Sequence, residues 1–285
     1  MSLEVGVVGL GIMGGSIAKL LLDQGYKVFG FDLSVPQLEA AKANGVNLCS
    51  TVQDLFNRSD FIFTSLPSGG ALISTLEELN AYKKGAVIVD LSTLSLNVKQ
   101  QAHDLCQSKN IDLLDCPISG TGAQAVSGDL VIYASGSNAI YLKVEKVFAA
   151  FSRICYYVGP FGNGTKLKLA ANLLVAIHNT ATAEAINLAQ ATGIDNDVIL
   201  NLLGAGAGGS RVFELRAPMM LERTYMPATM KLSTWAKDLI LIEELAQSFD
   251  ADTPLFKKAL ELYKELSLSE PEAHDTASII ESYKK

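Results

Sequence analysis

A chain of 285 residues, 49% hydrophobic and 19% charged, is long enough to bury the cores of two ordinary domains. Its net charge of −7 and its lack of any basic run argue against nucleic acid as a main partner. The mean hydropathy of +0.25 is high, yet no uninterrupted apolar run approaches the roughly 18–20 residues that a membrane span needs. We therefore expect no membrane partner.

The N-terminus and the cysteines bear on location and metal binding. The first residues lead directly into an apolar run, with no basic region and no small-residue cleavage site, so we expect no targeting peptide. Cys49, Cys106, Cys116 and Cys155 show no metal-type spacing, and a disulfide framework is uncommon in a chain of this size. The sequence therefore predicts a cytoplasmic protein without a metal site.

The first chemical motif is a glycine-rich turn between a strand and a helix. Residues 3–8 form an apolar run typical of a buried strand, and residues 16–25 have the pattern of a helix. In such a turn the first glycine permits the bend, the second lets the backbone approach a pyrophosphate, and the third lets helix and strand pack closely. The turn consists of Gly9, Leu10, Gly11, Ile12, Met13 and Gly14.

A carboxylate follows the turn at the distance that a dinucleotide site requires. Residues 26–32 indicate a second strand, which ends at Asp32, 18 positions after Gly14. In dinucleotide-binding folds an acid about 20 residues beyond the glycines binds the hydroxyls of the adenosine ribose. This carboxylate would repel the 2′-phosphate of NADP, so the sequence favours NAD over NADP as the cofactor.

Strands and helices continue to alternate beyond Asp32. Strands that alternate with helices predict an α/β domain with a doubly wound, mostly parallel, Rossmann-type sheet. Ligands of such sheets lie beyond the carboxyl ends of the strands. Three of these strands are expected at 60–67, 85–93 and 111–120. Residues at or just beyond their ends are candidates for contact with the ligand: Leu66, Pro67, Ser92, Thr93, Ser119, Gly120 and Thr121.

The second half of the chain changes character. Residues 129–136 and 154–159 read as further strands with a helix at about 139–150 between them, and the strand pattern then disappears. We expect a boundary at Phe161, with an NAD-binding domain at 1–161 and an all-α substrate and dimerisation domain at 162–285. After a long first helix, further helices are expected at 196–204, 210–221, 232–250 and 254–267.

The long helix, which joins the two domains, carries polar side chains in an apolar setting. From Thr165 to Gly193 its composition is apolar almost all the way round, which predicts a largely buried helix. Lys168 and Asn172 are four positions apart and so share one face, whereas Lys166 lies about 200° round from Lys168. Either Lys168 points into a site with Asn172, or its stem packs on apolar surface while its ammonium reaches water.

Five motifs along the chain carry a family resemblance. They are GLGIMG at 9–14, DLST at 90–93, DCPISGTGAQAVSG at 115–128, GNGTKLKLAAN at 162–172 and WAKDL at 235–239. Together they resemble the β-hydroxyacid dehydrogenase family, which includes 3-hydroxyisobutyrate dehydrogenase and is related to 6-phosphogluconate dehydrogenase. The resemblance extends over nearly the whole chain.

The resemblance implies roles for residues at matching positions. Lys168 is similar to the catalytic lysine and Asn172 to its substrate-binding partner, while Ser119, Gly120 and Thr121 resemble the loop that holds the substrate carboxylate. Thr93 resembles the threonine beside the nicotinamide, and Lys237 the lysine of the C-terminal domain that closes over cofactor and substrate.

Two departures from the family pattern bear on the substrate. Thr121 stands where the family usually has a second glycine, and Ala171 precedes Asn172 where two adjacent asparagines are common. A side chain at position 121 narrows or polarises the carboxylate loop, so the usual substrate of the family is not transferred directly to this chain.

The chemistry of these residues suggests an oxidoreductase. NAD⁺ takes a hydride from an alcohol carbon, and the protein supplies the base that takes the hydroxyl proton. A lysine in a partly apolar site beside a cationic nicotinamide has its ammonium form disfavoured, so Lys168 is the expected general acid and base. The leading hypothesis is an NAD-dependent dehydrogenase of a small, carboxylate-bearing hydroxy acid, similar to 3-hydroxyisobutyrate.

Other hypotheses stay open at this point. An imine or semialdehyde reductase uses a related fold, although the resemblance suggests that an imine reductase would lack a lysine at position 168. A non-catalytic NAD(H)-binding module is the other alternative. The apolar helical domain and the positive mean hydropathy also predict a homodimer or homotetramer.

Overall fold

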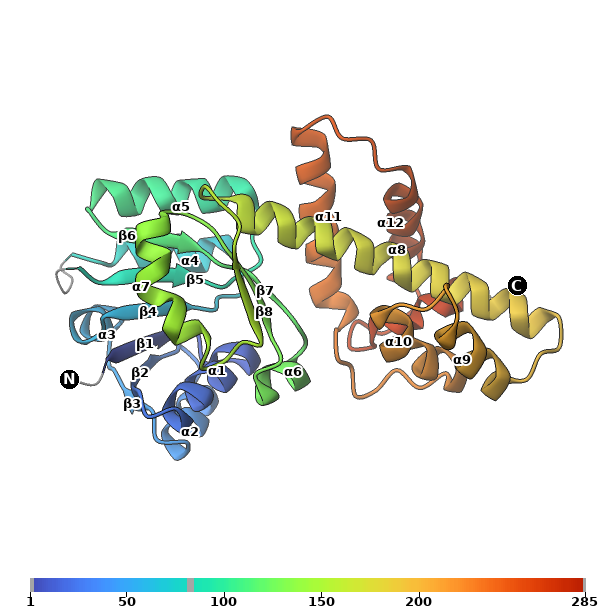
Figure 1. Ribbon diagram of the computed structural model, residues 1–285, viewed down its shortest axis with the longest axis horizontal. Helices are drawn as coiled ribbons and strands as arrows, with labels where there is room; N and C mark the ends of the chain where they lie inside the picture. Colours follow the sequence, from blue (N-terminus) through green and yellow to red (C-terminus); the bar gives the residue numbers. More distant parts are fainter. Residues whose placement is uncertain (1–2, 81–84, 284–285) are drawn as a thin grey trace. The chain divides into compact units, whose positions relative to one another are not determined.

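The computed structural model describes residues 3–80 and 85–283 (Figure 1). The chain divides into two compact units, Met1–Lys168 and Leu169–Lys285. The dividing point lies inside α8 (Asn163–Ala191), a helix of 29 residues that therefore contributes to both units. In the described part of the chain, no helix combines the length and the apolar character that crossing a bilayer requires.

The first unit contains the predicted doubly wound parallel sheet. Six strands of the described ranges pair in the order β3-β2-β1-β4-β5-β6, and every pairing is parallel. The Rossmann-type prediction is thus confirmed. The strands are β1 (Glu4–Val8), β2 (Lys27–Phe31), β3 (Asn47–Leu48), β4 (Phe61–Thr64), β5 (Val87–Asp90) and β6 (Asp112–Asp115).

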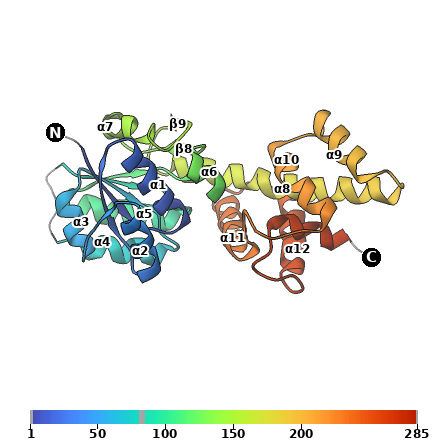
Figure 2. The same ribbon diagram turned by 90° about the horizontal axis from the view of Figure 1, so that it is seen from below.

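Alternate strand residues fill two separate cores, one on each face of the sheet. Successive side chains of a strand point to opposite faces, so Val7 joins one core while Val8 joins the other. The first core includes residues of α1 (Ile12–Asp23), α2 (Val35–Ala43) and α7 (Asn138–Phe148). The second core includes residues of α3 (Val52–Arg58), α4 (Gly69–Glu77) and α5 (Leu96–Ser108). Figure 2 shows α7 and α3 on opposite sides of the sheet.

The strand expected at 111–120 is in fact two strands in two sheets. The chain leaves the large sheet after β6, and β7 (Ile118–Ser119) begins a small sheet of order β7-β8-β9. Pro117 stands between them and has no N–H to donate to a continuing ladder. Here β8 (Val131–Ala134) pairs antiparallel with β7 and parallel with β9 (Ile154–Tyr157). The short helix α6 (Gly122–Ser127) follows β7 directly.

The second unit is helical, as the sequence predicts. After α8 come α9 (Asn196–Ala205), α10 (Arg211–Glu222), α11 (Leu232–Ser248), α12 (Pro254–Leu266) and a 3₁₀ segment η1 (Thr276–Tyr283) that the sequence pattern did not indicate. Trp235 and Tyr263 lie at the centre of its core, with ring centroids 6.1 Å apart.

The prediction that α8 is largely buried is wrong for the single chain. Its buried positions within the second unit follow one stripe, which includes Ala176, Ala183 and Ile186. Leu174 and Leu188 both lie on the side of the helix opposite this stripe, and they are 53% and 66% exposed. The other helices of the second unit cover only one face of α8. Apolar side chains on its other face therefore stay exposed in the single chain.

Candidate active site

The glycine turn after β1 has the backbone geometry of a pyrophosphate site. Gly9 has a φ of +87°, and a Cβ there would lie 2.2 Å from the carbonyl oxygen of Ser65. A Cβ at Gly14 would lie 1.8 Å from the carbonyl oxygen of Gly9, so only glycine lets α1 approach the turn this closely. A Cβ at Gly11 would meet no atom within 4 Å, and α1 begins there without a side-chain cap. Open space at an uncapped helix N-terminus suits a phosphate.

Asp32 ties the end of β2 to the glycine turn. Its Oδ2 accepts a hydrogen bond from the Leu10 N–H at 2.6 Å, and its Oδ1 accepts one from the Ser34 N–H at 2.8 Å. Each carboxylate oxygen keeps further lone-pair capacity for a ribose hydroxyl. The half-buried carboxylate therefore fits the role that its spacing from Gly14 predicts.

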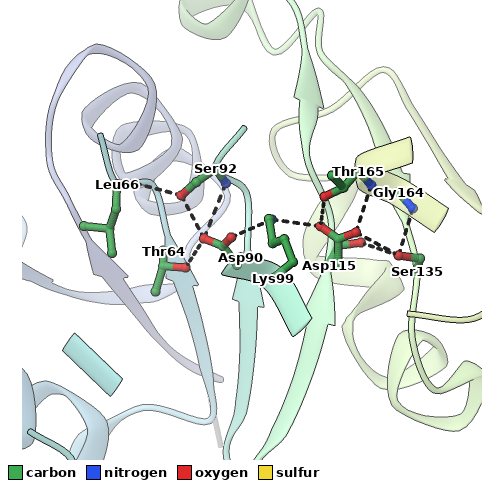
Figure 3. Close-up of polar contacts among 9 residues, drawn as sticks. All are labelled: Thr64, Leu66, Asp90, Ser92, Lys99, Asp115, Ser135, Gly164 and Thr165. Atoms are coloured by element: carbon green, nitrogen blue, oxygen red, sulfur yellow. Dashed lines mark hydrogen bonds and ion pairs between the residues drawn. The ribbon is translucent and has the colours of Figure 1, made fainter. Parts of the chain in front are cut away.

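A second polar group fixes the ends of β4 and β5 (Figure 3). Asp90 Oδ1 accepts hydrogen bonds from Thr64 Oγ1 at 2.6 Å and Ser92 Oγ at 2.8 Å. Ser92 Oγ in turn accepts the Leu66 N–H at 2.9 Å. These bonds hold the turn that carries Leu66 and the exposed Pro67 next to Ser92, and the half-buried Thr93 follows Ser92 in the chain.

The Asp90 carboxylate also belongs to a buried ion cluster. Lys99 Nζ, from the first turn of α5, lies 2.6 Å from Asp90 Oδ2 and 2.8 Å from Asp115 Oδ1 (Figure 3). The side chains of Lys99 and Asp115 are 0% exposed, and that of Asp90 is 1% exposed. Burial disfavours the ammonium, but the charges of Asp115 and Asp90 outweigh burial and raise the pKa of Lys99 above its ordinary value.

Asp115 connects this cluster to the start of α8. Its Oδ2 accepts the Thr165 N–H at 2.8 Å, and its Oδ1 accepts Thr165 Oγ1 at 2.9 Å. Ser135 Oγ donates to the carbonyl oxygen of Asp115 at 3.0 Å and accepts the Gly164 N–H at 2.9 Å. A Cβ at Gly164 would lie 2.3 Å from the carbonyl oxygen of Tyr133, so the helix begins in close contact with β8. The first turn of α8 is therefore held by side chains outside the helix.

The loop from Ser119 to Thr121 lies beside the glycine turn. A Cβ at Gly122, the next residue, would lie 2.8 Å from the side chain of Ile12. Gly120 has a φ of +151°, and a Cβ there would lie 2.6 Å from Leu130. The structure thus brings this loop and the dinucleotide turn together in the first unit.

Thr121, not Ser119, is the N-cap of α6. The Thr121 N–H donates to Gln124 Oε1 at 3.0 Å, so that amide is already used by a side chain of the same loop. Ser119 is half-buried, and its hydroxyl is not part of the cap. Ser119 is therefore not the residue that caps the following helix.

Lys168 and Asn172 are buried one turn apart on α8. They are 7% and 4% exposed. Lys166 differs, since it is half-buried and its Nζ lies 3.4 Å from Asn163 Oδ1. Lys168 and Asn172 thus share a buried face of α8, as their spacing predicts, whereas Lys166 lies on a different, partly exposed face.

Asn172 has a partner that the sequence prediction did not include. Its Nδ2 donates to Asp238 Oδ2 at 3.0 Å, and Asp238 is 4% exposed. Lys237 Nζ lies 3.8 Å from Asp238 Oδ1, with 40% of its own side chain exposed. Of these two neighbouring charged residues, the lysine is in contact with solvent and the aspartate is buried.

Lys99, Asp90, Asp115 and Asp238 are therefore the functional candidates that sequence reasoning missed. A signal existed for Lys99, because it shares the apolar stripe of α5 with Ala102 and Cys106 three and seven positions on. Asp238 carried a weaker signal, since it lies on the buried side of α11 between Trp235 and Ile242.

Two family models match adjoining parts of the chain. A model described as the NAD binding domain of 6-phosphogluconate dehydrogenase matches residues 4–159. A model described as NAD-binding of NADP-dependent 3-hydroxyisobutyrate dehydrogenase matches residues 162–283.

Individual proteins match over nearly the full length. The 2-(hydroxymethyl)glutarate dehydrogenase of Eubacterium barkeri is 30% identical over 267 residues, which cover 92% of this chain and 89% of that protein. A structure of Mycobacterium tuberculosis 3-hydroxyisobutyrate dehydrogenase with L-serine has a TM-score of 0.92 at 22% identity and covers 100% of both chains. An imine reductase from Myxococcus stipitatus has a TM-score of 0.68 at 19% identity, again over 100% of both chains. At these identities the two structural matches show the fold alone.

Proposed function

Since this chain belongs to the β-hydroxyacid dehydrogenase family of NAD-binding oxidoreductases, we propose that it transfers a hydride between NAD and a short-chain hydroxy acid similar to 3-hydroxyisobutyrate, with Lys168 as general acid and base. The observation that carries the proposal is the placement of Lys168 and Asn172. Both are buried on one side of α8, so the ammonium or amine of Lys168 and the amide of Asn172 lie one helical turn apart on the same face.

The cofactor site is proposed at the glycine turn. The geometry of Gly9, Gly11 and Gly14 and the uncapped start of α1 support a pyrophosphate there, and Asp32 supports a ribose with a free 2′-hydroxyl. NAD is therefore proposed as the preferred cofactor, with NADP second. When bound, the nicotinamide supplies the hydride acceptor, and all other steps fall to side chains of the chain. The residues proposed to line its length are Gly9, Leu10, Gly11, Ile12, Met13, Gly14, Asp32, Leu66, Pro67, Thr93 and Lys237.

Lys168 is proposed to move the hydroxyl proton. As the neutral amine, its Nζ accepts the proton of the substrate hydroxyl when the alcohol is oxidised, and as the ammonium it returns the proton to the carbonyl oxygen in reduction. Because Asn172 Nδ2 already donates to Asp238, the amide presents its carbonyl oxygen as an acceptor. We propose that this oxygen orients the substrate hydroxyl.

The substrate carboxylate is proposed to bind at Ser119, Gly120 and Thr121. Ser119 supplies a hydroxyl, and Gly120, whose φ of +151° is one that other residues rarely adopt, supplies a backbone N–H group. The Thr121 N–H is engaged by Gln124, and the threonine side chain takes the space of a glycine hydrogen. Fewer N–H groups and less room distinguish this loop from a two-glycine loop, which supports a substrate different from the usual one.

Three alternatives are second candidates. A semialdehyde reductase is the same reaction run in the direction of reduction and needs no other residues. An imine reductase is favoured by fold similarity alone, while the buried Lys168 favours a hydroxyl substrate. A non-catalytic NAD(H)-binding module would give no reason for a buried lysine and asparagine on one helix face.

A functional boundary after Phe161 is also proposed. The first domain, 1–161, would bind NAD, and the second, 162–285, would complete the substrate site and form the subunit interface. The two family models end at 159 and begin at 162, which supports this division.

A substrate screen tests the proposal. Hydroxy acids of two to four carbons are offered with NAD⁺, and NADH formation is followed by absorbance, with each acid's amide as the matched control. We expect turnover of at least one acid and little turnover of its amide. Turnover of amines but of no hydroxy acid would favour the imine reductase, and no turnover in either direction would favour the non-catalytic module.

A further inference from the structure

Lys99 occupies a place that is costly for a lysine. Its side chain is 0% exposed and lies on the buried side of α5 with Ala102 and Cys106, yet its ammonium reaches two carboxylates at 2.6 and 2.8 Å. Taking one ammonium and two carboxylates out of water costs more than a well-packed apolar group would, so stability alone is a weak reason for such a cluster.

The cluster carries one negative charge in excess. The positive end of α8 offsets this charge, because the Thr165 N–H of its first turn donates to Asp115. The other groups on the two carboxylates are neutral hydroxyls and N–H groups. Two thiols lie nearby, those of Cys106 and Cys116; burial raises the pKa of both, so both are neutral near pH 7.

Each carboxylate organises a different part of the candidate site. Asp90 fixes Ser92, and through Ser92 the Leu66 N–H, on the cofactor side. Asp115 fixes Thr165, which is three residues before Lys168 on the same helix. The Lys99 ammonium is the contact that joins these two parts (Figure 3).

We propose that Lys99 is a positioning residue for the reaction, whose ammonium, by pairing with both Asp90 and Asp115, holds the first turn of α8 and with it the direction of Lys168. This inference rests on the proposed function. Lys99 touches neither substrate nor cofactor in this scheme and acts through the two carboxylates.

Loss of the ammonium leaves the two carboxylates without the cation that pairs with both. In Lys99→Met, Asp90 and Asp115 stay buried with no positive side chain between them, and like charges held close in a buried place repel each other. Asp115 is then held less firmly against β5, so the first turn of α8, which Asp115 binds through Thr165, is expected to loosen.

The experiment compares three variants. Lys99→Met removes the ammonium, and Lys99→Met with Asp90→Asn also removes the repulsion. Lys109→Met is the matched control, because Lys109 caps the opposite end of α5 and its ammonium binds the carbonyl oxygens of Leu76, Glu77 and Leu79. This substitution is expected to lower stability without changing the ion cluster. For each variant, kcat and KM are measured, and hydrogen exchange is measured by mass spectrometry for the peptide 162–168.

The expected result is a kcat lowered by about 10- to 100-fold in Lys99→Met, the cost of a misplaced catalytic group, with KM changed much less. The peptide 162–168 exchanges faster than in the wild type, while the middle of α8 does not. Lys109→Met keeps the wild-type kcat and the wild-type exchange at 162–168. The double variant exchanges more slowly at 162–168 than Lys99→Met but keeps a lowered kcat.

A wild-type kcat in Lys99→Met, or an equal loss of kcat in Lys109→Met, would overturn the inference. If Lys99→Met does not fold, wild-type kcat in the double variant overturns it instead. Hydrogen exchange requires no turnover, so unchanged exchange at 162–168 refutes the positioning role even if the proposed reaction is wrong. If the proposed reaction itself is wrong, the wild-type protein shows no turnover of hydroxy acids, and this result is distinct from the hydrogen-exchange result.

Discussion

Asp32 sets the expected choice between NAD and NADP. Its carboxylate already accepts the N–H groups of Leu10 and Ser34, so it is fixed where a ribose hydroxyl would bind and where a 2′-phosphate would be repelled. We expect Asp32→Ala to lower kcat/KM for NAD⁺ by roughly 10- to 100-fold, since a hydrogen bond to a charged group is worth about 1.5–3 kcal/mol. Activity with NADP⁺ should fall less or rise.

The measurement is kcat/KM with both dinucleotides. Asp32→Asn is the matched variant, because it keeps the size of the side chain and removes the charge. A wild-type enzyme that prefers NADP⁺ would show that Asp32 does not face the ribose.

Ser119 is expected to act in binding more than in the chemical step. Its hydroxyl would contact a carboxylate that is charged in both the ground state and the transition state, so Ser119→Ala should raise KM by about 10-fold with a smaller change in kcat. Ser127→Ala is the control, because Ser127 is an exposed serine of the adjoining α6 that donates only to the carbonyl oxygen of Gln124. If the two substitutions changed KM equally in steady-state kinetics, Ser119 would not be a substrate-binding residue.

At the scale of single elements, most of the fold was predictable because the spacing of the apolar residues and the positions of the turn and cap residues indicated the same helices and strands. The buried parallel strands are continuous apolar runs, and glycine or serine residues mark the helix ends. The two-residue β3 was missed because two residues hold no periodic pattern. The run at 111–120 was predicted as one strand, since the effect of Pro117 depends on the pairing partner of each half.

The candidate site was predictable only in part. The glycine turn, Asp32 and Lys168 stand in motifs whose spacing has a local meaning, and the family resemblance drawn from those motifs is confirmed. The contacts of Lys99 and Asp238 join residues far apart in the chain, so no local spacing encodes them. The Thr121 N–H bond to Gln124 is local, and its capping-box spacing of three residues can be read from the sequence.

The exposed leucines of α8 lead to a prediction about assembly. Leu174 and Leu188 leave an apolar surface that a second subunit would cover, which supports the expected homodimer or homotetramer. Replacing both by glutamine should shift the protein toward monomer in light scattering. Leu142→Gln, at a leucine 58% exposed on α7, is the control and should not. A wild-type protein that is monomeric at micromolar concentration would contradict the prediction.

At the scale of the whole molecule, buried acids predict a loss of stability at alkaline pH. Burial, aided by Asp54, raises the pKa of Cys49 from 9.0 to about 11, and burial raises that of Cys106 to about 12. The folded state therefore holds these protons more tightly than the unfolded state. This contribution is fully present below pH 9 and is lost as pH rises through the folded pKa values.

Thermal unfolding between about pH 7.5 and about pH 10.5 tests this expectation. The midpoint should stay level up to about pH 9 and then fall, and Cys49→Ala should make the fall shallower. A midpoint that does not change up to about pH 10.5 would contradict the linkage argued from burial.

The central claim about the whole enzyme is that Lys168 moves the substrate proton. Lys168→Ala should leave the fold and NAD⁺ binding largely intact, because α8 is held by its apolar stripe and by Thr165, and alanine is a good helix former. Lys168→Arg should not restore activity, since a guanidinium stays protonated and cannot act as a base. Lys166→Ala, on another side of the same helix, is the control.

The most direct measurement is the pH dependence of kcat for alcohol oxidation in the wild type, Lys168→Ala and Lys166→Ala, with NAD⁺ affinity checked by fluorescence. We predict that kcat falls by roughly 10²–10⁴ in Lys168→Ala, the usual loss for a positioned acid–base group, and that the rise of rate with pH disappears. Lys166→Ala should match the wild type. Near wild-type kcat in Lys168→Ala, or damage confined to Lys166→Ala, would contradict the claim.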